Sequence, residues 1–236
     1  MKKFSKLKIV VGLAYLLMVT LVVVSFFYYG INSFLDLDFL KNNKDKIFNF
    51  RDENFILISI VYFLSSVIWV FLLGFATPLI IIAGFAFGAI WGSVLSVISF
   101  AVGASLLYTF ANHFFKESVH EHLASKFLSL KNHFNENEFS YFFFIRVIPG
   151  IPFAVKNIMP VLFDMKLKNF FFATLLGELV PTAIAVSIIA GFAEVIENSE
   201  KLNLNAFYSP KIYLPLIGLG LMVLITNYLK KKYFRK

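Results

Sequence analysis

Arg146 has the greatest potential for chemistry in this sequence. It lies in an apolar stretch, Phe139 to Phe163, that is interrupted by three prolines and a glycine. A charged side chain deep in a membrane segment costs at least about 2.5 kcal/mol unless it is paired or hydrated. Its guanidinium offers a planar fork of donors suited to two phosphate oxygens. We therefore predict that Arg146 binds an anionic phosphate group. The structural alternative is an arginine that snorkels to the interface.

The same stretch contains further residues that would complete such a binding site. Lys156 and Asn157 follow the prolines Pro149 and Pro152, and both side chains can donate hydrogen bonds to an anionic headgroup. The prolines would form the turn that brings these donors toward Arg146. For Lys156, snorkelling is again the structural alternative.

Glu178 is the acidic residue nearest the middle of an apolar run, Asn169 to Ala193. A carboxylate at that depth must find a cation, become protonated or face water. Two interpretations stay open: a proton- or sodium-coupling site, and a structural salt bridge with Arg146.

Glycines and prolines predict how the segments pack and turn. Gly84, Gly88 and Gly92 recur every four residues, which indicates one small-residue face for close helix packing. The residues expected to shape the hairpins and spans are Pro78, Gly84, Gly88, Gly92, Gly103, Gly177 and Pro181.

Composition predicts an all-α, polytopic integral membrane protein. Hydrophobic residues make up 59% of the chain, and no charged residue occurs from Asn54 to Phe115. There is no cysteine, no phosphate loop and no Ser/His/Asp arrangement, so we expect neither an enzyme with catalytic residues nor a metal site or cofactor. The net charge of +8 comes largely from lysines at both ends, which favours contact with lipid headgroups over nucleic acid.

The apolar runs differ in kind. Five read as full spans: Ile9 to Leu35, Asn54 to Phe75, Gly92 to Phe115, Asn169 to Ala193 with a kink at Pro181, and Ile212 to Leu229. Two others, Pro78 to Gly88 and Phe139 to Phe163, are too short or too broken to cross, and we predict re-entrant helical hairpins. Lys116 to Glu138 has the periodicity of an amphipathic helix. We divide the chain into residues 1–53, a membrane domain 54–196, and a last helix with a basic tail, 197–236.

The two hairpins suggest a pseudo-inverted repeat. Placing Pro78 over Pro152, an offset of 74, also places Gly103 over Gly177. Duplicated units with broken hydrophobic segments at matching positions are typical of secondary transporters.

At these residues the chain resembles the DedA superfamily, whose shared region is called the VTT domain. The matching elements are Thr77-Pro78 with Ala83 to Gly88 and Gly92, and Arg146 to Phe153 with Asn157, Gly177 and Pro181, within Gly74 to Phe192. The resemblance implies two facing re-entrant hairpins and a role in moving lipids across the bilayer. Many members carry acidic residues around the first hairpin, but this chain has none between Glu53 and Glu117.

Three functions follow as expectations. The first is a flippase or scramblase for the headgroups of phospholipids or isoprenoid phosphates, with membrane lipids as partners. The second is a proton- or sodium-coupled transporter of a small solute, and the third is a non-transporting scaffold. The resemblance favours a bacterial plasma membrane, and the basic N-terminus favours the cytoplasmic side. The side of the C-terminus and homo-oligomerisation stay open.

Overall fold

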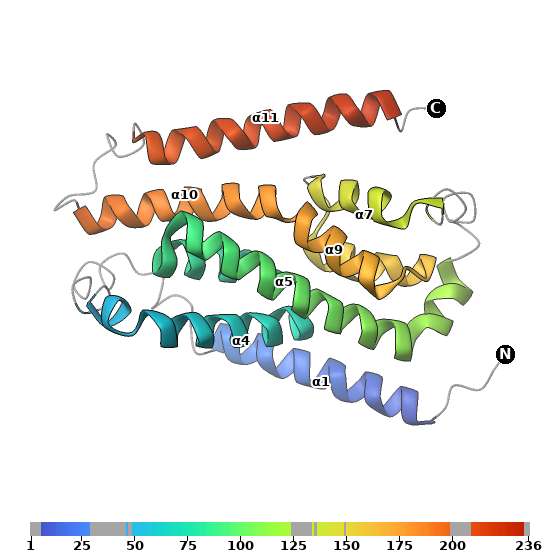
Figure 1. The fold of residues 1–236 in the computed structure, drawn as a ribbon. Coiled ribbons are helices and arrows are strands. Elements are labelled where there is room, and N and C mark those ends of the chain that lie inside the picture. The colour runs from blue at the N-terminus through green and yellow to red at the C-terminus, as the bar shows by residue number, and fades with distance from the viewer. Residues whose placement is uncertain are drawn as a thin grey trace.

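The computed structural model describes residues 6–28, 46, 49–123, 134, 136–148, 150–198 and 209–233, and these are almost entirely helical (Figure 1). The elements are α1 Lys6–Tyr28, α4 Phe55–Leu73, α5 Thr77–Leu123, α7 Glu138–Val147, α8 Phe153–Ile158, the 3₁₀ helix η2 Met159–Phe163, α9 Leu167–Gly177, α10 Leu179–Asn198 and α11 Pro210–Tyr233. No strand occurs in these ranges, so the all-α prediction is confirmed.

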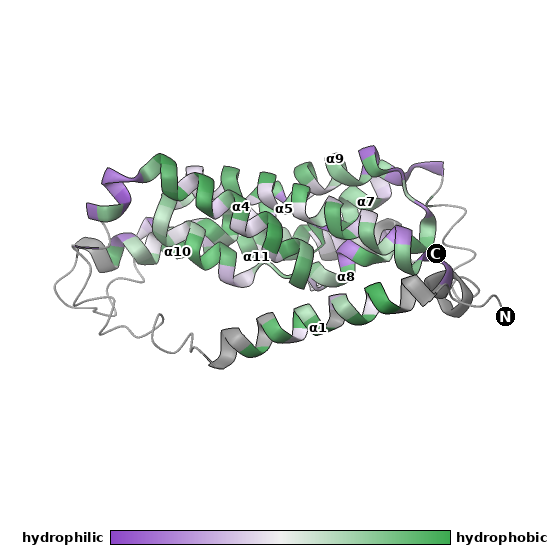
Figure 2. Ribbon diagram, turned by 90° about the horizontal axis from the view of Figure 1, so that it is seen from below, coloured by the Kyte–Doolittle hydropathy of each residue, from purple (hydrophilic) through white to green (hydrophobic). Residues whose placement is uncertain are grey.

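Three stretches of helix are long and apolar enough to cross a membrane: Phe55–Leu73, Thr77–Glu117 and Leu167–Val195. Hydrophobic residues cover most of the helices, and hydrophilic ones gather toward the ends of the bundle (Figure 2). The predicted first and last spans form helices α1 and α11, in which shorter apolar stretches are found, Val10–Leu21 and Pro210–Thr226. Their crossing of the bilayer stays a prediction.

The first helical unit comprises α4 and α5. The chain reverses after Gly74 (φ 67°), and the start of α5 runs back along α4, so that Phe87 meets Phe55 with ring centroids 5.8 Å apart. At Gly88 (φ 70°, ψ −172°) the helix breaks and the chain reverses again. The Tyr62 hydroxyl lies between the two arms of α5, 3.2 Å from the Leu79 carbonyl and 2.6 Å from Ser96 Oγ.

The glycines of this unit do not form one continuous face. Gly84 packs against α10, where an added Cβ would lie 2.6 Å from Ile189, and Gly92 approaches the Ala83 carbonyl across the hairpin. Gly88 instead forms the turn, with a backbone conformation that glycine adopts without a steric penalty. The prediction of a single small-residue face is therefore wrong for Gly88, because the helix does not continue through it.

The second unit comprises α7, α8, η2 and α9–α10. After α7 the chain turns through Gly150 (φ 90°), and α8 and η2 run back along α7. The rings of Phe134 and Phe163 stack at 4.5 Å, and Glu138 Oε2 accepts from the Lys166 amide at 3.1 Å. A second reversal at Asp164 (φ 56°) leads into α9.

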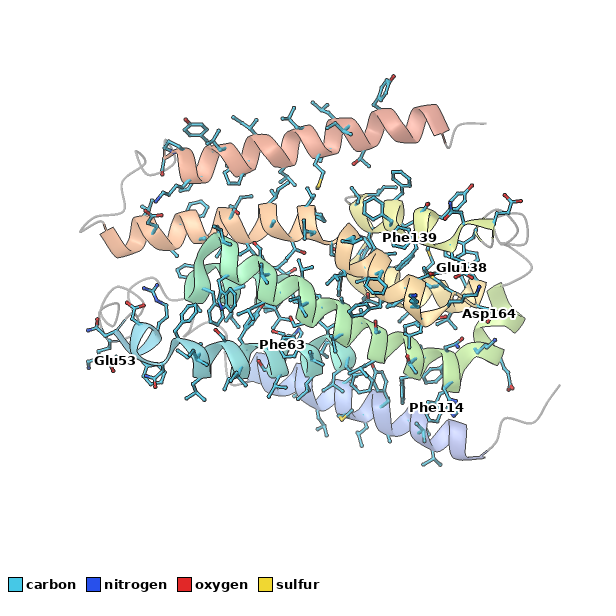
Figure 3. All side chains as sticks on the ribbon, in the orientation of Figure 1. Glu53, Phe63, Phe114, Glu138, Phe139 and Asp164 are labelled. Atoms are coloured by element: carbon cyan, nitrogen blue, oxygen red, sulfur yellow. The ribbon has the colours of Figure 1, made fainter. Side chains whose placement is uncertain are left out.

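The two units enter the bundle from opposite ends. Figure 3 shows Glu53, just before α4, at one end, and Glu138 and Asp164 at the other. The positive-φ residues have matching spacing: Gly74 and Gly88 are 14 residues apart, as are Gly150 and Asp164. These turns correspond at an offset of 76 rather than 74, because Pro152 precedes α8 while Pro78 lies within the first turn of α5. Re-entrance into a bilayer and the pseudo-repeat itself stay predictions.

The predicted span from Asn169 to Ala193 is divided in two. Helix α9 ends at Gly177 and α10 begins at Leu179, with Glu178 between them. Pro181 has no amide hydrogen to bond to the Gly177 carbonyl, so it weakens the turn that precedes it. The predicted disruption is thus present, three residues before the proline.

The outer helices are held by few polar contacts. On α1, the Tyr15 hydroxyl donates to the Leu72 carbonyl at 2.7 Å. On α11, Lys211 pairs with Glu194 of α10. The amphipathic helix expected over Lys116 to Glu138 is described only in part: its first residues, to Leu123, are the end of α5. Residues 124–133 and 135 lie outside the described ranges, as does Pro149.

A substitution at Gly103 tests the close packing of α4 against α5 in the first unit. A Cβ at this position would lie 2.8 Å from the Val67 carbonyl oxygen and 2.8 Å from Val70 Cβ, so Gly103→Ala forces α4 away from α5. We expect a loss of about 1–3 kcal/mol in stability, measured as a lower Tm and a smaller monodisperse fraction in detergent. Gly220→Ala is the control, because nothing lies within 4 Å of its added Cβ. Equal Tm values for the two variants would contradict this packing.

Candidate functional site

Arg146, Lys156 and Glu178 form a buried charged cluster at the turn of the second unit. Arg146 lies in the last turn of α7, Lys156 on α8, and Glu178 at the break between α9 and α10. Arg146 Nη1 and Lys156 Nζ lie 3.5 and 3.4 Å from the same oxygen, Glu178 Oε1. Lys156 Nζ also donates to the Arg146 carbonyl at 2.8 Å. The sequence interpretation of an Arg146–Glu178 ion pair is therefore confirmed as geometry.

The cluster carries an excess of positive charge. It has two cations and one carboxylate, and all three side chains are less than a tenth exposed. Helix α4 and α5 as far as Phe115 contain no charged side chain that would balance it. Buried charge that is only partly compensated is costly in a low-dielectric interior, so this cluster favours a further anion.

Three phenylalanine rings surround the guanidinium. Arg146 Cζ lies 4.8 Å from the ring centroid of Phe142, 5.1 Å from that of Phe153 and 5.3 Å from that of Phe170. Cations within about 6 Å of an aromatic face are attracted by its quadrupole, by about 2 kcal/mol or more where water is excluded. The rings thus stabilise the charge without occupying its N–H donors.

The donors of the cluster are largely unused. Nε, Nη1 and Nη2 of Arg146 make no hydrogen bond within the described structure, although Nη1 is in ion-pair range of Glu178. Both amide atoms of Asn157 and the hydroxyl of Thr174 are likewise buried without a partner there. Buried polar groups in native proteins are normally hydrogen-bonded, and those that are not commonly mark a ligand or water position.

Helical spacing places these groups on the helix faces that carry the rings around Arg146. Each of three helices carries a ring that contacts Arg146 and, one turn later, a polar residue on the same face. The pairs are Phe142 with Arg146 on α7, Phe153 with Asn157 on α8, and Phe170 with Thr174 on α9. This arrangement makes one aromatic layer beside one polar layer.

Gly177 allows α9 to approach α7 at this point. A Cβ added to Gly177 would lie 2.5 Å from Arg146 Cβ and 3.0 Å from the Phe143 carbonyl oxygen. In the first unit, Gly103 contacts Val67 and Val70 in the same manner. In the predicted pseudo-repeat, Val70, which is also fully buried, would correspond to Arg146.

The cluster lies close to the outer surface. The turn residues Gly150 and Pro152 are exposed, and so are Val155 and Ile158 on the outer face of α8. Lys156 and Asn157, between them in sequence, face inward.

The predicted binding residues Arg146, Lys156 and Asn157 are thus in one unit, and Glu178 joins two of them. Pro152 is the N-cap of α8, and its carbonyl accepts from the Lys156 amide at 3.1 Å. The sequence analysis missed Thr174 and the three rings. The sequence does contain a pattern that points to them, because each ring lies four residues before a polar residue. The pattern was not recognised because phenylalanine is abundant throughout the chain.

Comparison with protein families agrees with this organisation. Residues 75–191, which contain both hairpins and the charged cluster, match the model of the VTT domain. The chain is a DedA/VTT-domain membrane protein. No solved structure matches it significantly.

Relatives with curated names include proteins from eukaryotes. A Transmembrane protein 41 homolog from Caenorhabditis elegans is 30% identical over 58% of this chain and 57% of its own length. Transmembrane protein 41B from Homo sapiens is 24% identical over 73% of this chain and 61% of its own length, and that from Rattus norvegicus is 24% identical over 85% and 68%. The chain thus spans about three fifths of the first of these relatives. Membrane location is shown, and the bacterial plasma membrane stays a prediction.

A substitution at Thr174 tests whether its hydroxyl contributes to the stability of the protein. Because that hydroxyl has no partner among the described residues, Thr174→Val should leave Tm unchanged or raise it. Tyr108→Phe is the contrast, since the Tyr108 hydroxyl donates to the Met165 carbonyl at 2.5 Å, and its loss should cost about 1–3 kcal/mol. Thermal unfolding in detergent measures both variants. A Thr174→Val protein that melts as early as Tyr108→Phe would show that the hydroxyl has a structural role.

Proposed function

We propose that this protein is a lipid flippase or scramblase, and not an enzyme, in which Arg146 binds the phosphate of a lipid headgroup. The observation that carries the proposal is the buried guanidinium whose charge is stabilised by three rings while its N–H groups have no hydrogen-bond acceptor. A phosphate has only acceptor oxygens and a negative charge, so it complements both properties.

The surrounding groups would assist that binding. Lys156 adds a second cation, and Asn157 and Thr174 offer unused donors in the same polar layer. A headgroup crossing the hydrocarbon must replace its water by other polar groups, because unsatisfied charge there is costly. A polar layer within an apolar bundle supplies such groups along the crossing.

The exposed face of α8 supports entry from the side. Val155 is 50% and Ile158 43% exposed, which suits contact with acyl chains while the headgroup reaches the inward-facing Lys156. A lipid could keep its tails in the bilayer throughout. This feature favours a lipid over a small solute.

The ion-coupling role expected for Glu178 belongs to the alternative proposal, a proton- or sodium-coupled solute transporter. In this structure the carboxylate already faces two cations, so a proton or sodium ion would have to compete with both. The scaffold alternative assigns no role to unpaired donors. We also propose that the N-terminus is cytoplasmic, on the basis of its lysines.

Arg146→Met tests the proposed function. It keeps much of the side-chain volume and removes the donors, so we expect headgroup translocation in proteoliposomes to fall at least about tenfold. Arg146→Lys keeps the charge without the planar fork and should retain an intermediate rate. Translocation is followed by the accessibility of a tail-labelled phospholipid to an impermeant quencher.

Lys168→Gln is the matched control, because it removes one positive charge from an exposed position on α9. Size-exclusion profiles and Tm establish that each variant is folded. Unchanged translocation by folded Arg146→Met protein would refute the assigned role. Uptake of a soluble phosphodiester such as glycerophosphocholine at the rate of the lipid would favour the solute transporter instead.

A further inference from the structure

We infer that Glu178 sets the charge of the anion that this site accepts to one, so that the substrate is a lipid phosphodiester and not a phosphomonoester. This inference rests on the proposed function and narrows it. Phospholipids with a diester headgroup carry one phosphate charge, whereas isoprenoid phosphates and phosphatidic acid are monoesters, with close to two charges above pH 7.

The geometry places the carboxylate where it offsets one of the two cations. A single oxygen, Oε1, lies 3.5 Å from Arg146 Nη1 and 3.4 Å from Lys156 Nζ. The carboxylate approaches Arg146 at Nη1 alone, so it offsets the charge of Arg146 while Nε and Nη2 have no partner among the described residues and are left for a ligand. The empty cluster carries one net positive charge.

No other charged side chain in the described structure adjoins the cluster. Arg146 of α7 and Lys156 of α8 are themselves members of the cluster. Helices α4 and α5 contain no charged side chain before Lys116. Lys116 pairs with Asp164, and Glu138 binds the start of α9. On the far side of α10, Glu194 pairs with Lys211 of α11. The charge of the cluster is therefore set by its own three members.

This charge selects among headgroups. A monoanionic phosphodiester makes the occupied cluster neutral, while a dianionic phosphomonoester leaves one uncompensated negative charge in a dry environment. Uncompensated buried charge carries a large penalty, whereas a neutral assembly avoids it. Discrimination between the two classes then depends on the number of charges and not on headgroup shape.

The backbone fixes Glu178 in this position. Its amide donates to the Thr174 carbonyl and its carbonyl accepts from the Thr182 amide, both at 3.0 Å, although it separates two helices. Glutamine has the same size and keeps these bonds. Glu178→Gln therefore changes the charge of the cluster from one to two while retaining the backbone that supports it.

The test compares phosphatidylglycerol, a diester, with phosphatidic acid, a monoester, in proteoliposomes at pH 8, using the same labelled tails. Wild-type protein should translocate phosphatidylglycerol at least about tenfold faster. Glu178→Gln should reverse or abolish this preference. The double variant Glu178→Gln with Lys156→Gln again carries one positive charge and should restore it, at a lower absolute rate.

A measurement on the unmodified protein covers the case in which Glu178→Gln does not fold. Lowering the pH from 8 to 5 removes the second charge of phosphatidic acid, so the wild-type preference for phosphatidylglycerol should disappear. A preference that persists at pH 5, or a folded Glu178→Gln protein with the wild-type preference, would overturn the charge rule and leave the proposed function standing. Wild-type protein that moves neither lipid would overturn both.

Discussion

The charge of Arg146 is the constraint on which this structure depends. A guanidinium with no exposed surface, in an otherwise apolar bundle, requires partners from every side. Helix α7 provides it, α8 returns to place Phe153 and Lys156 against it, and α9 brings Phe170 and Glu178. Three features bring α7, α8 and α9 together at Arg146. They are the turn after α7, the close approach at Gly177 and the break before Pro181.

The two units have similarly spaced turns but different side chains next to them. Val70 and Arg146 each lie four residues before a positive-φ glycine, and each packs against a glycine, Gly103 of α5 and Gly177 of α9 respectively. Val70 is fully buried and apolar, and a polar contact in this unit's interior joins two hydroxyl groups, those of Tyr62 and Ser96, which membrane helices tolerate at little cost. One unit therefore provides a stable packing surface, and the other carries the charge. Both are needed, because a strained polar cluster persists only where its surroundings are firmly packed.

Much of this fold could be predicted from the sequence, because hydrophobic length and uncharged runs reflect a strong physical requirement. The helix α4 and the division of the region from Phe139 to Phe163 follow from apolar length and from proline. The turn at Gly88 could not be separated from helix packing, since a glycine supports both. The pairing of Arg146 with Glu178 was one of two open interpretations. The i, i+4 spacing of the rings and Thr174 is visible in the sequence, but the many other phenylalanines do not allow it to be told from chance without the three-dimensional contacts.

If the proposed function holds, the partial neutralisation of the cluster would limit how tightly it retains a headgroup. Aromatic faces and one carboxylate stabilise the cations without a ligand. Unused donors on Arg146, Asn157 and Thr174 give an anion a gain in hydrogen bonds as it enters. That gain is limited, because Glu178 already offsets part of the positive charge. A transporter needs both properties, since a site that bound the headgroup too tightly would retain it and not pass it on.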